Sequence, residues 1–184
     1  MSAANEEYPR RTGSAFPPVL DACCGPKGMW FDRNDKRAVF MDKRCETYHI
    51  DKGTPGTIGR KAIVVAPDKV ADFTAIPFPP EVFDHVVFDP PHIEQCADTG
   101  VIVKRYGMLT GEWRDMLRRG FAECFRVLRP GGTLIFKWNE CRIPLREILA
   151  LTPERPLYGH QSGAKMQTHW VAFLKPNAER EVRT

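Results

Sequence analysis

The sequence lacks the long apolar run that a membrane-spanning helix needs. No stretch of its 184 residues approaches the roughly 20 consecutive apolar residues that cross a bilayer. Its opening, MSAANEEYPRRTGSAFPP, carries acids and prolines where a secretory signal has an apolar core. We therefore expect a cytoplasmic protein that has no membrane partner.

The sequence also lacks the ligand spacing of a metal site. Its six cysteines include no Cys-x-x-Cys pair. The adjacent Cys23 and Cys24 have no second cluster of cysteine or histidine at zinc spacing. Cysteines of a cytoplasmic chain are reduced thiols rather than a disulfide framework. We expect neither a metal nor disulfides.

Internal repeats, low-complexity segments and a concentrated basic stripe are absent as well. The formal charge of +4 and the pI near 8.8 permit a nucleic-acid partner without requiring one. With 42% hydrophobic and 27% charged residues, the chain can bury a core. Its length predicts one domain over residues 1–184, with flexible ends at 1–15 and 177–184.

What the sequence does contain is a series of short apolar runs that are continuous rather than alternating. Such runs are typical of strands that are covered on both faces of a parallel sheet. They occupy residues 18–24, 38–42, 62–66, 85–89, 133–136 and 170–174.

Helical patterns separate some of these runs. Apolar residues recur at helical spacing from Glu112 to Leu128, and Pro130-Gly131-Gly132 is expected to stop this helix. A second helix is predicted from about Pro144 to Leu151. The polar stretch from His92 to Gly111 has no clear period and is predicted to be a long functional loop. The alternation predicts an α/β fold, a single doubly wound and mostly parallel sheet with helices on both faces.

Ligands of such sheets bind outside the carboxyl ends of the strands. The first run ends in Asp21-Ala-Cys-Cys-Gly-Pro-Lys-Gly28, whose glycines let a ligand approach the backbone. Cys23 stands where a dinucleotide fingerprint requires glycine, so the turn alone is also compatible with an ordinary connection. The second run ends in Asp42, which is placed to bind both hydroxyls of a ribose; a solvated acid is the alternative.

The run at 85–89 ends in Asp89-Pro90-Pro91-His92. Two prolines cannot continue a central strand, so the chain must leave the sheet in a stiff, extended turn with Asp89 at its head. Alternatively, the two prolines could serve only to direct the chain out of the sheet. That would not explain why an acidic residue, Asp89, ends an otherwise apolar strand.

These motifs together resemble class I S-adenosylmethionine-dependent methyltransferases, with a Rossmann-like fold. The similarity is closer to the amino-methyltransferase branch, which carries an (Asp/Asn)-Pro-Pro-(Tyr/Phe/Trp) motif, and to small phage-type DNA adenine methylases. It covers roughly residues 17–138 and includes Ala71-Asp-Phe-Thr-Ala-Ile-Pro-Phe78 and Arg126-Val-Leu-Arg-Pro-Gly-Gly-Thr-Leu134.

The resemblance implies a site for S-adenosyl-L-methionine and a catalytic motif. By position, Asp21, Cys23 and Gly25 would line the methionine moiety, Asp42 would hold the ribose, and Asp72 with Phe73 would meet the adenine. Asp89, Pro90, Pro91 and His92 would form the catalytic motif. Cys23 and Lys27 replace glycines of the family, and His92 replaces its stacking aromatic.

The acceptor implied is an amine, with adenine in DNA first and RNA, a protein glutamine or a small molecule as alternatives. Lys104, Arg105, Arg114, Arg118 and Arg119 could contact phosphates, or form a mixed solvated surface with the acids among them. His160 and His169 could border the cleft or serve structure. A non-catalytic nucleic-acid-binding module also stays open, as does a dimer or partner that recognises the target.

Overall fold

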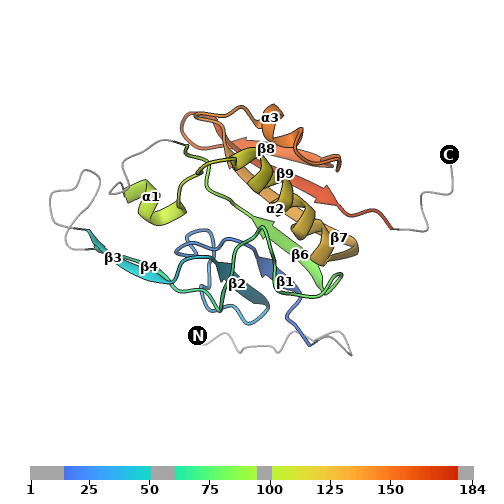
Figure 1. The fold of residues 1–184 in the computed structure, drawn as a ribbon, viewed down its shortest axis with the longest axis horizontal. Helices are drawn as coiled ribbons and strands as arrows, with labels where there is room; N and C mark the ends of the chain where they lie inside the picture. Colours follow the sequence, from blue (N-terminus) through green and yellow to red (C-terminus); the bar gives the residue numbers. More distant parts are fainter. Residues whose placement is uncertain (1–14, 51–60, 95–100, 178–184) are drawn as a thin grey trace, which may run out of the picture.

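The computed structural model describes residues 15–50, 61–94 and 101–177. Figure 1 shows a twisted central sheet, a separate hairpin at one side and a long helix across one face of the sheet. The strands are β1 (Val19–Asp21), β2 (Ala38–Asp42), β3 (Glu46–Ile50), β4 (Lys61–Val65), β5 (Lys69–Val70), β6 (Phe83–Phe88), β7 (Leu128–Asn139), β8 (Tyr158–Ser162) and β9 (Thr168–Leu174). The helices are α1 (Val101–Tyr106), α2 (Trp113–Val127) and α3 (Leu145–Leu149).

The sheet has seven strands in the order β5-β2-β1-β6-β7-β9-β8. The first five of these strands run parallel, and β9 is antiparallel to both β7 and β8. The predicted fold class, a mostly parallel Rossmann-like sheet, is confirmed. The winding direction reverses between β1 and β6, so a ligand crevice is expected beyond the carboxyl ends of these two strands.

One predicted strand does not join the sheet. The run at 62–66 forms β4, which pairs antiparallel with β3 outside the sheet. Ile63 and Val65 are buried, whereas Val64 is 48% exposed. The strand is therefore covered on one face only, although its apolar sequence suggested burial on both.

The sequence analysis did not predict three of the strands, because they have no apolar run. β5 has two residues, both exposed, and β8 is an exposed edge strand of Tyr-Gly-His-Gln-Ser. β3 begins with the polar pair Glu46 and Thr47. Edge strands need few buried side chains, so hydrophobic patterning does not reveal them.

The two predicted helices are confirmed, with shorter bounds. α2 ends at Val127 because Leu128 is extended, with φ −76° and ψ 135°. The Pro130-Gly131-Gly132 stretch, expected to stop the helix, lies inside β7 instead. The stretch His92–Gly111 is not only a loop, since it contains α1; residues 95–100 lie outside the described residues. The ends predicted to be flexible also lie outside them, except for residues 15 and 177.

The core is an aromatic cluster between α2 and the middle of the sheet. Phe121 of α2 meets Phe88 of β6 with ring centroids 5.4 Å apart and Phe136 of β7 at 4.9 Å. None of the helices in the described ranges is long and apolar enough to cross a membrane.

The connection from β1 to β2, residues 22–37, contains turns and no helix. Trp30 of this connection packs edge-on against Phe40 of β2, with centroids 4.7 Å apart. Trp30 therefore covers a part of the sheet where a doubly wound fold usually places a helix.

We expect Gly120→Ala to destabilise the protein. A Cβ atom at Gly120 would lie 2.8 Å from ring atoms of both Phe73 and Phe88, which are themselves packed together in the core. Overpacking costs about 1–3 kcal/mol, which exceeds the gain of up to about 1 kcal/mol from replacing a helical glycine. Urea unfolding should show a lower free energy of unfolding. Gly28→Ala is the control, because its Cβ meets nothing within 4 Å; equal stabilities of the two variants would contradict the packing argument.

Candidate functional site

A cavity of about 300 Å³ opens where β1, β2 and β6 end. This is the place where the sheet reverses its winding, as expected for a ligand site. Its lining comes from the turn after β1, the end of β2, the turn after β6, helix α1 and β7. The lining residues are Cys23, Cys24, Gly25, Pro26, Gly28, Met29, Arg33, Asp42, Lys43, Arg44, Phe73, Asp89, Pro91, Arg105, Tyr106, Gly107 and Lys137.

Asp21 ends β1 and is fully buried behind this lining. Its carboxylate accepts hydrogen bonds from Trp30 Nε1 at 2.7 Å and from the Cys23 backbone N–H at 3.3 Å. Burial raises the pKa of Asp21 to about 7, against the lowering effect of these two donors; nearby Asp89 and Asp42 raise it further. Asp21 thus anchors the turn 22–30 and adds little negative charge below neutral pH.

Asp42 ends β2 and is also buried. Its Oδ2 accepts the Gly25 backbone N–H at 2.9 Å, which joins the end of β2 to the turn after β1. Gly25 has φ +50°, and a Cβ there would lie 2.9 Å from the Arg105 carbonyl oxygen. Glycine at this position therefore permits both the turn and the close approach of α1.

Arg44 connects Asp42 with helix α1. Its Nε lies 3.2 Å from Asp42 Oδ1, and its Nη atoms donate to the carbonyls of Lys104 at 3.1 Å and Arg105 at 3.3 Å. A guanidinium at a helix C-terminus satisfies carbonyls that lack an intrahelical partner. One side chain thus holds α1 over the cavity.

Asp89 follows β6, and its side chain is 9% exposed. Lys137 of β7 donates to its Oδ2 at 2.6 Å. Burial raises the pKa of Asp89, while the charge and hydrogen bond of Lys137 and the nearby His92 lower it. Asp89 and Lys137 form a close ion pair on the cavity wall.

Three aromatic side chains surround this ion pair. Lys137 Nζ lies 5.9 Å from the Tyr106 ring centroid and 5.4 Å from that of Trp170. The His92 ring lies 6.0 Å from that of Tyr106, and burial lowers the pKa of His92, which favours its neutral form. Of these three rings, that of Tyr106 is on the cavity wall, and those of His92 and Trp170 are not.

The structure brings some of the predicted site residues to the cavity and leaves others away from it. Those on the wall are Cys23, Gly25, Asp42, Phe73, Asp89 and Pro91. Those off the wall are Asp21, Asp72, Pro90 and His92. The Asp72 carboxylate closes a local turn, because it accepts the backbone N–H and the hydroxyl of Thr74, both at 2.9 Å.

The sequence analysis missed Arg44, Tyr106 and Lys137. Lys137 lies at the carboxyl-terminal part of β7, two residues before the strand ends, and a charged residue in an apolar strand was the available signal. Arg44 carried none, because its contacts join segments about 60 residues apart in the chain. Tyr106 lies in the stretch predicted to be a functional loop, but nothing in the sequence singled it out.

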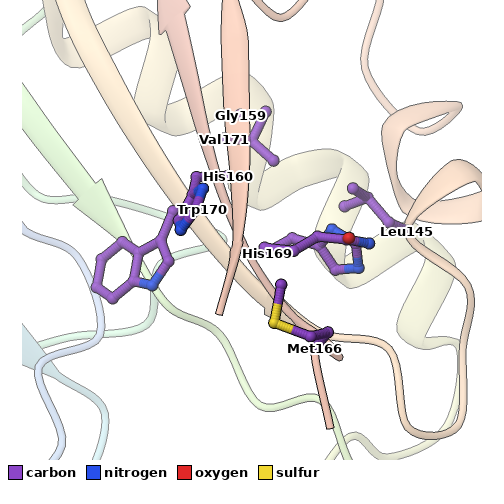
Figure 2. Close-up of a pocket in the computed structure, with 8 residues that line it drawn as sticks. Leu145, Gly159, His160, Met166, His169, Trp170 and Val171 are labelled. Atoms are coloured by element: carbon purple, nitrogen blue, oxygen red, sulfur yellow. The ribbon is translucent and has the colours of Figure 1, made fainter. Parts of the chain in front are cut away.

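A second, more open depression lies beside β8 and β9 (Figure 2), and His160 and His169 line it. In Figure 2 the side chains of His160 and Trp170 lie on one side of the strands and that of His169 on the other. His169 Nε2 lies 2.9 Å from Glu140 Oε1. His169 thus serves the packing of this edge, and neither histidine lines the cavity at the sheet reversal. No cluster of three or more metal-ligating side chains occurs in the described ranges.

Comparison with known proteins agrees with this architecture. No protein family profile matches the chain. A malonyl-[acyl-carrier protein] O-methyltransferase of Enterobacter lignolyticus (strain SCF1) is 30% identical over 122 residues. The matching region is 66% of this chain but only 38% of that protein, so the chain spans about two fifths of this relative.

Two solved structures are similar over most of the chain. The PH0226 protein from Pyrococcus horikoshii OT3 has a TM-score of 0.53 and 16% identity, covering 86% of this chain and 81% of that one. The N-methyltransferase NodS from Bradyrhizobium japonicum WM9 has a TM-score of 0.52 and 14% identity, covering 86% and 85%. This chain therefore has the Rossmann-like fold of class I methyltransferases.

Proposed function

We propose that the protein is an S-adenosylmethionine-dependent methyltransferase that transfers a methyl group to an amine nitrogen. The exocyclic amine of adenine in DNA is the first candidate acceptor, and RNA is the second. The observation that carries this proposal is the placement of Asp89. A largely buried carboxylate directly after β6 faces the same cavity as Asp42, and the Tyr106 ring lies on the same wall.

The residues of the cavity fit the cofactor at three of its parts. Asp42 would offer its carboxylate oxygens, which it shares with the Gly25 backbone N–H and Arg44, to the ribose hydroxyls. Cys23 lies at the turn that would meet the methionine part. The adenine would contact Phe73 and Asp72, of which one oxygen, Oδ1, also accepts the Thr74 backbone N–H and hydroxyl.

When bound, S-adenosylmethionine supplies a methyl group bonded to a cationic sulfur. Asp89 accepts a hydrogen bond from the acceptor amine and thereby orients its nitrogen lone pair. As the nitrogen gains positive charge, the fixed carboxylate stabilises that charge in a site with little water. Asp89 need not be a strong base, because the methylated nitrogen loses its proton easily.

Lys137 keeps Asp89 ready for this role. Burial alone would favour the neutral form of Asp89, in which one carboxyl oxygen carries a proton and no longer accepts as a carboxylate oxygen does. The Lys137 ammonium, 2.6 Å away, lowers the pKa of Asp89 and so favours the ionised form. Lys137 contacts Oδ2, so it acts on the amine through Asp89 and is a positioning residue.

The direct test is the transfer of labelled methyl from S-adenosylmethionine into separate pools of DNA, RNA, protein and small molecules. Label in DNA as N6-methyladenine is the expected result. The name of the curated relative describes transfer to oxygen on a carrier protein, so the protein pool also distinguishes that acceptor. Binding of DNA without binding of the cofactor would favour a non-catalytic module.

Asp42→Ala should weaken binding of S-adenosylmethionine by about 10- to 150-fold, because hydrogen bonds to a charged group contribute about 1.5–3 kcal/mol. Isothermal titration calorimetry measures this affinity. Asp35→Ala, which removes a surface carboxylate paired with Arg37, is the control and should bind normally. An unchanged affinity of the Asp42 variant would remove Asp42 from the cofactor site.

Asp89→Ala should lose at least about 100-fold in turnover, while cofactor affinity stays within a few fold, because the carboxylate acts mainly in the transition state. Asp89→Asn should lose less, since its amide oxygen still accepts a hydrogen bond. Single-turnover methyl transfer with saturating cofactor gives the comparison. A near-normal rate in Asp89→Ala would refute the mechanism.

Lys137→Met should shift the acid limb of the pH–rate profile to higher pH. The active form carries ionised Asp89, so the rate falls as pH drops through the pKa of Asp89, and loss of Lys137 raises that pKa. Lys137→Arg keeps the charge and should restore the original limb. Superimposed profiles for Lys137→Met and the natural protein would show that Lys137 serves packing alone.

A further inference from the structure

The cavity wall carries more positive than negative charge. Five cationic side chains line it, but only two carboxylates do, Asp42 and Asp89. Arg44 pairs with Asp42, and Lys137 pairs with Asp89. Three cations are therefore left over, namely Arg33, Lys43 and Arg105.

None of these three side chains has a carboxylate partner within the part of the chain that the structure describes. They come from three separate segments: the connection after β1, the residue after β2, and α1. Arg33 and Lys43 are exposed and Arg105 is half-buried, so they stand at the rim of the cavity rather than on its floor. By contrast, Arg114, Arg118 and Arg119 on α2 all have acidic neighbours.

The proposed cofactor does not balance this charge. S-adenosylmethionine has one carboxylate but two cationic groups, an ammonium and a sulfonium, so its arrival adds positive charge to the cavity. Like charges left together in a partly buried site repel one another. The excess points to an anionic group on the other ligand, the methyl acceptor.

We infer that Arg33, Lys43 and Arg105 bind the phosphates of a nucleic-acid strand whose target base enters the cavity toward Asp89. This inference rests on the proposed function and specifies how that site holds its acceptor. Phosphate contacts fix the register of a strand, and flat rings accept an unstacked base. The rim supplies the phosphate contacts, and Tyr106, which is on the cavity wall, supplies a ring.

The test is a binding measurement that needs no catalysis. A fluorescent single-stranded DNA of about a dozen nucleotides is titrated with protein saturated with S-adenosylhomocysteine, at several salt concentrations. The triple variant Arg33→Gln, Lys43→Gln, Arg105→Gln should bind about 10- to 100-fold more weakly. Its plot of log affinity against log salt should be shallower by about 2, since each of the three lost phosphate contacts on a single strand removes about 0.7 of a released counterion.

The matched control removes the same number of charges elsewhere. Arg114→Gln, Arg118→Gln, Arg119→Gln should bind the DNA within about twofold of the natural protein, because exposed charges distant from the strand are screened by salt. A DNA of the same sequence with uncharged methylphosphonate linkages should bind weakly to every variant. Both variants should keep the natural affinity for S-adenosylmethionine.

Several outcomes would overturn the inference. Equal losses in the two triple variants would indicate diffuse attraction rather than a rim site. Loss of S-adenosylmethionine affinity with unchanged DNA binding would assign the three cations to the cofactor carboxylate. Displacement of the DNA by a polyglutamate peptide of equal charge, at equal concentration, would point to an acidic protein acceptor. By contrast, failure of methyl transfer into DNA, with the expected binding results, would refute DNA as the methyl acceptor and leave the phosphate contacts standing.

Discussion

The structure depends on how three acidic side chains share one edge of the sheet. Asp21, Asp42 and Asp89 end or follow three neighbouring parallel strands, so their carboxyl groups gather at the same edge. Asp21 is fully buried, and Asp89 and Asp42 add to the effect of burial in raising its pKa. The donors around the three carboxyl groups are what allow them to lie so close together.

The negative charge of the three acids is stabilised by different donors, and each acid has a different task. Asp21 receives only neutral donors, from Trp30 and Cys23, and it holds the turn. Asp42 receives a backbone donor and the delocalised charge of Arg44. Asp89 receives a full ammonium charge on one oxygen. Only the third arrangement places a compact cation beside the carboxylate proposed to act in the reaction.

The sequence predicted the features that depend on local pattern. Buried strands with an acid at the end located Asp42 and Asp89, because the carboxyl ends of parallel strands meet at one edge. It could not predict the partners of these acids. Lys137 is 48 residues from Asp89 along the chain, and only the pairing of β6 with β7 brings them together.

The errors have equally specific causes. The run at 62–66 was assigned to the sheet because its composition is apolar, although Val64 is exposed in a hairpin. The assignment of Asp72 to the adenine stays a prediction; one of its oxygens, Oδ1, also accepts the hydroxyl of Thr74, two residues away. Short-range competition for a polar group is invisible to a motif unless its neighbours are considered.

Arg44 makes the cavity and its cover thermodynamically dependent on each other. The same guanidinium holds Asp42 and the last carbonyls of α1. A ligand hydroxyl that donates to Asp42 must share its oxygens with Arg44, which changes how firmly α1 is held. By reciprocity, a ligand that displaces α1 changes the affinity at Asp42 by the same factor. On the proposed function, a ligand at Asp42 and a ligand that contacts α1 would be coupled through this one side chain.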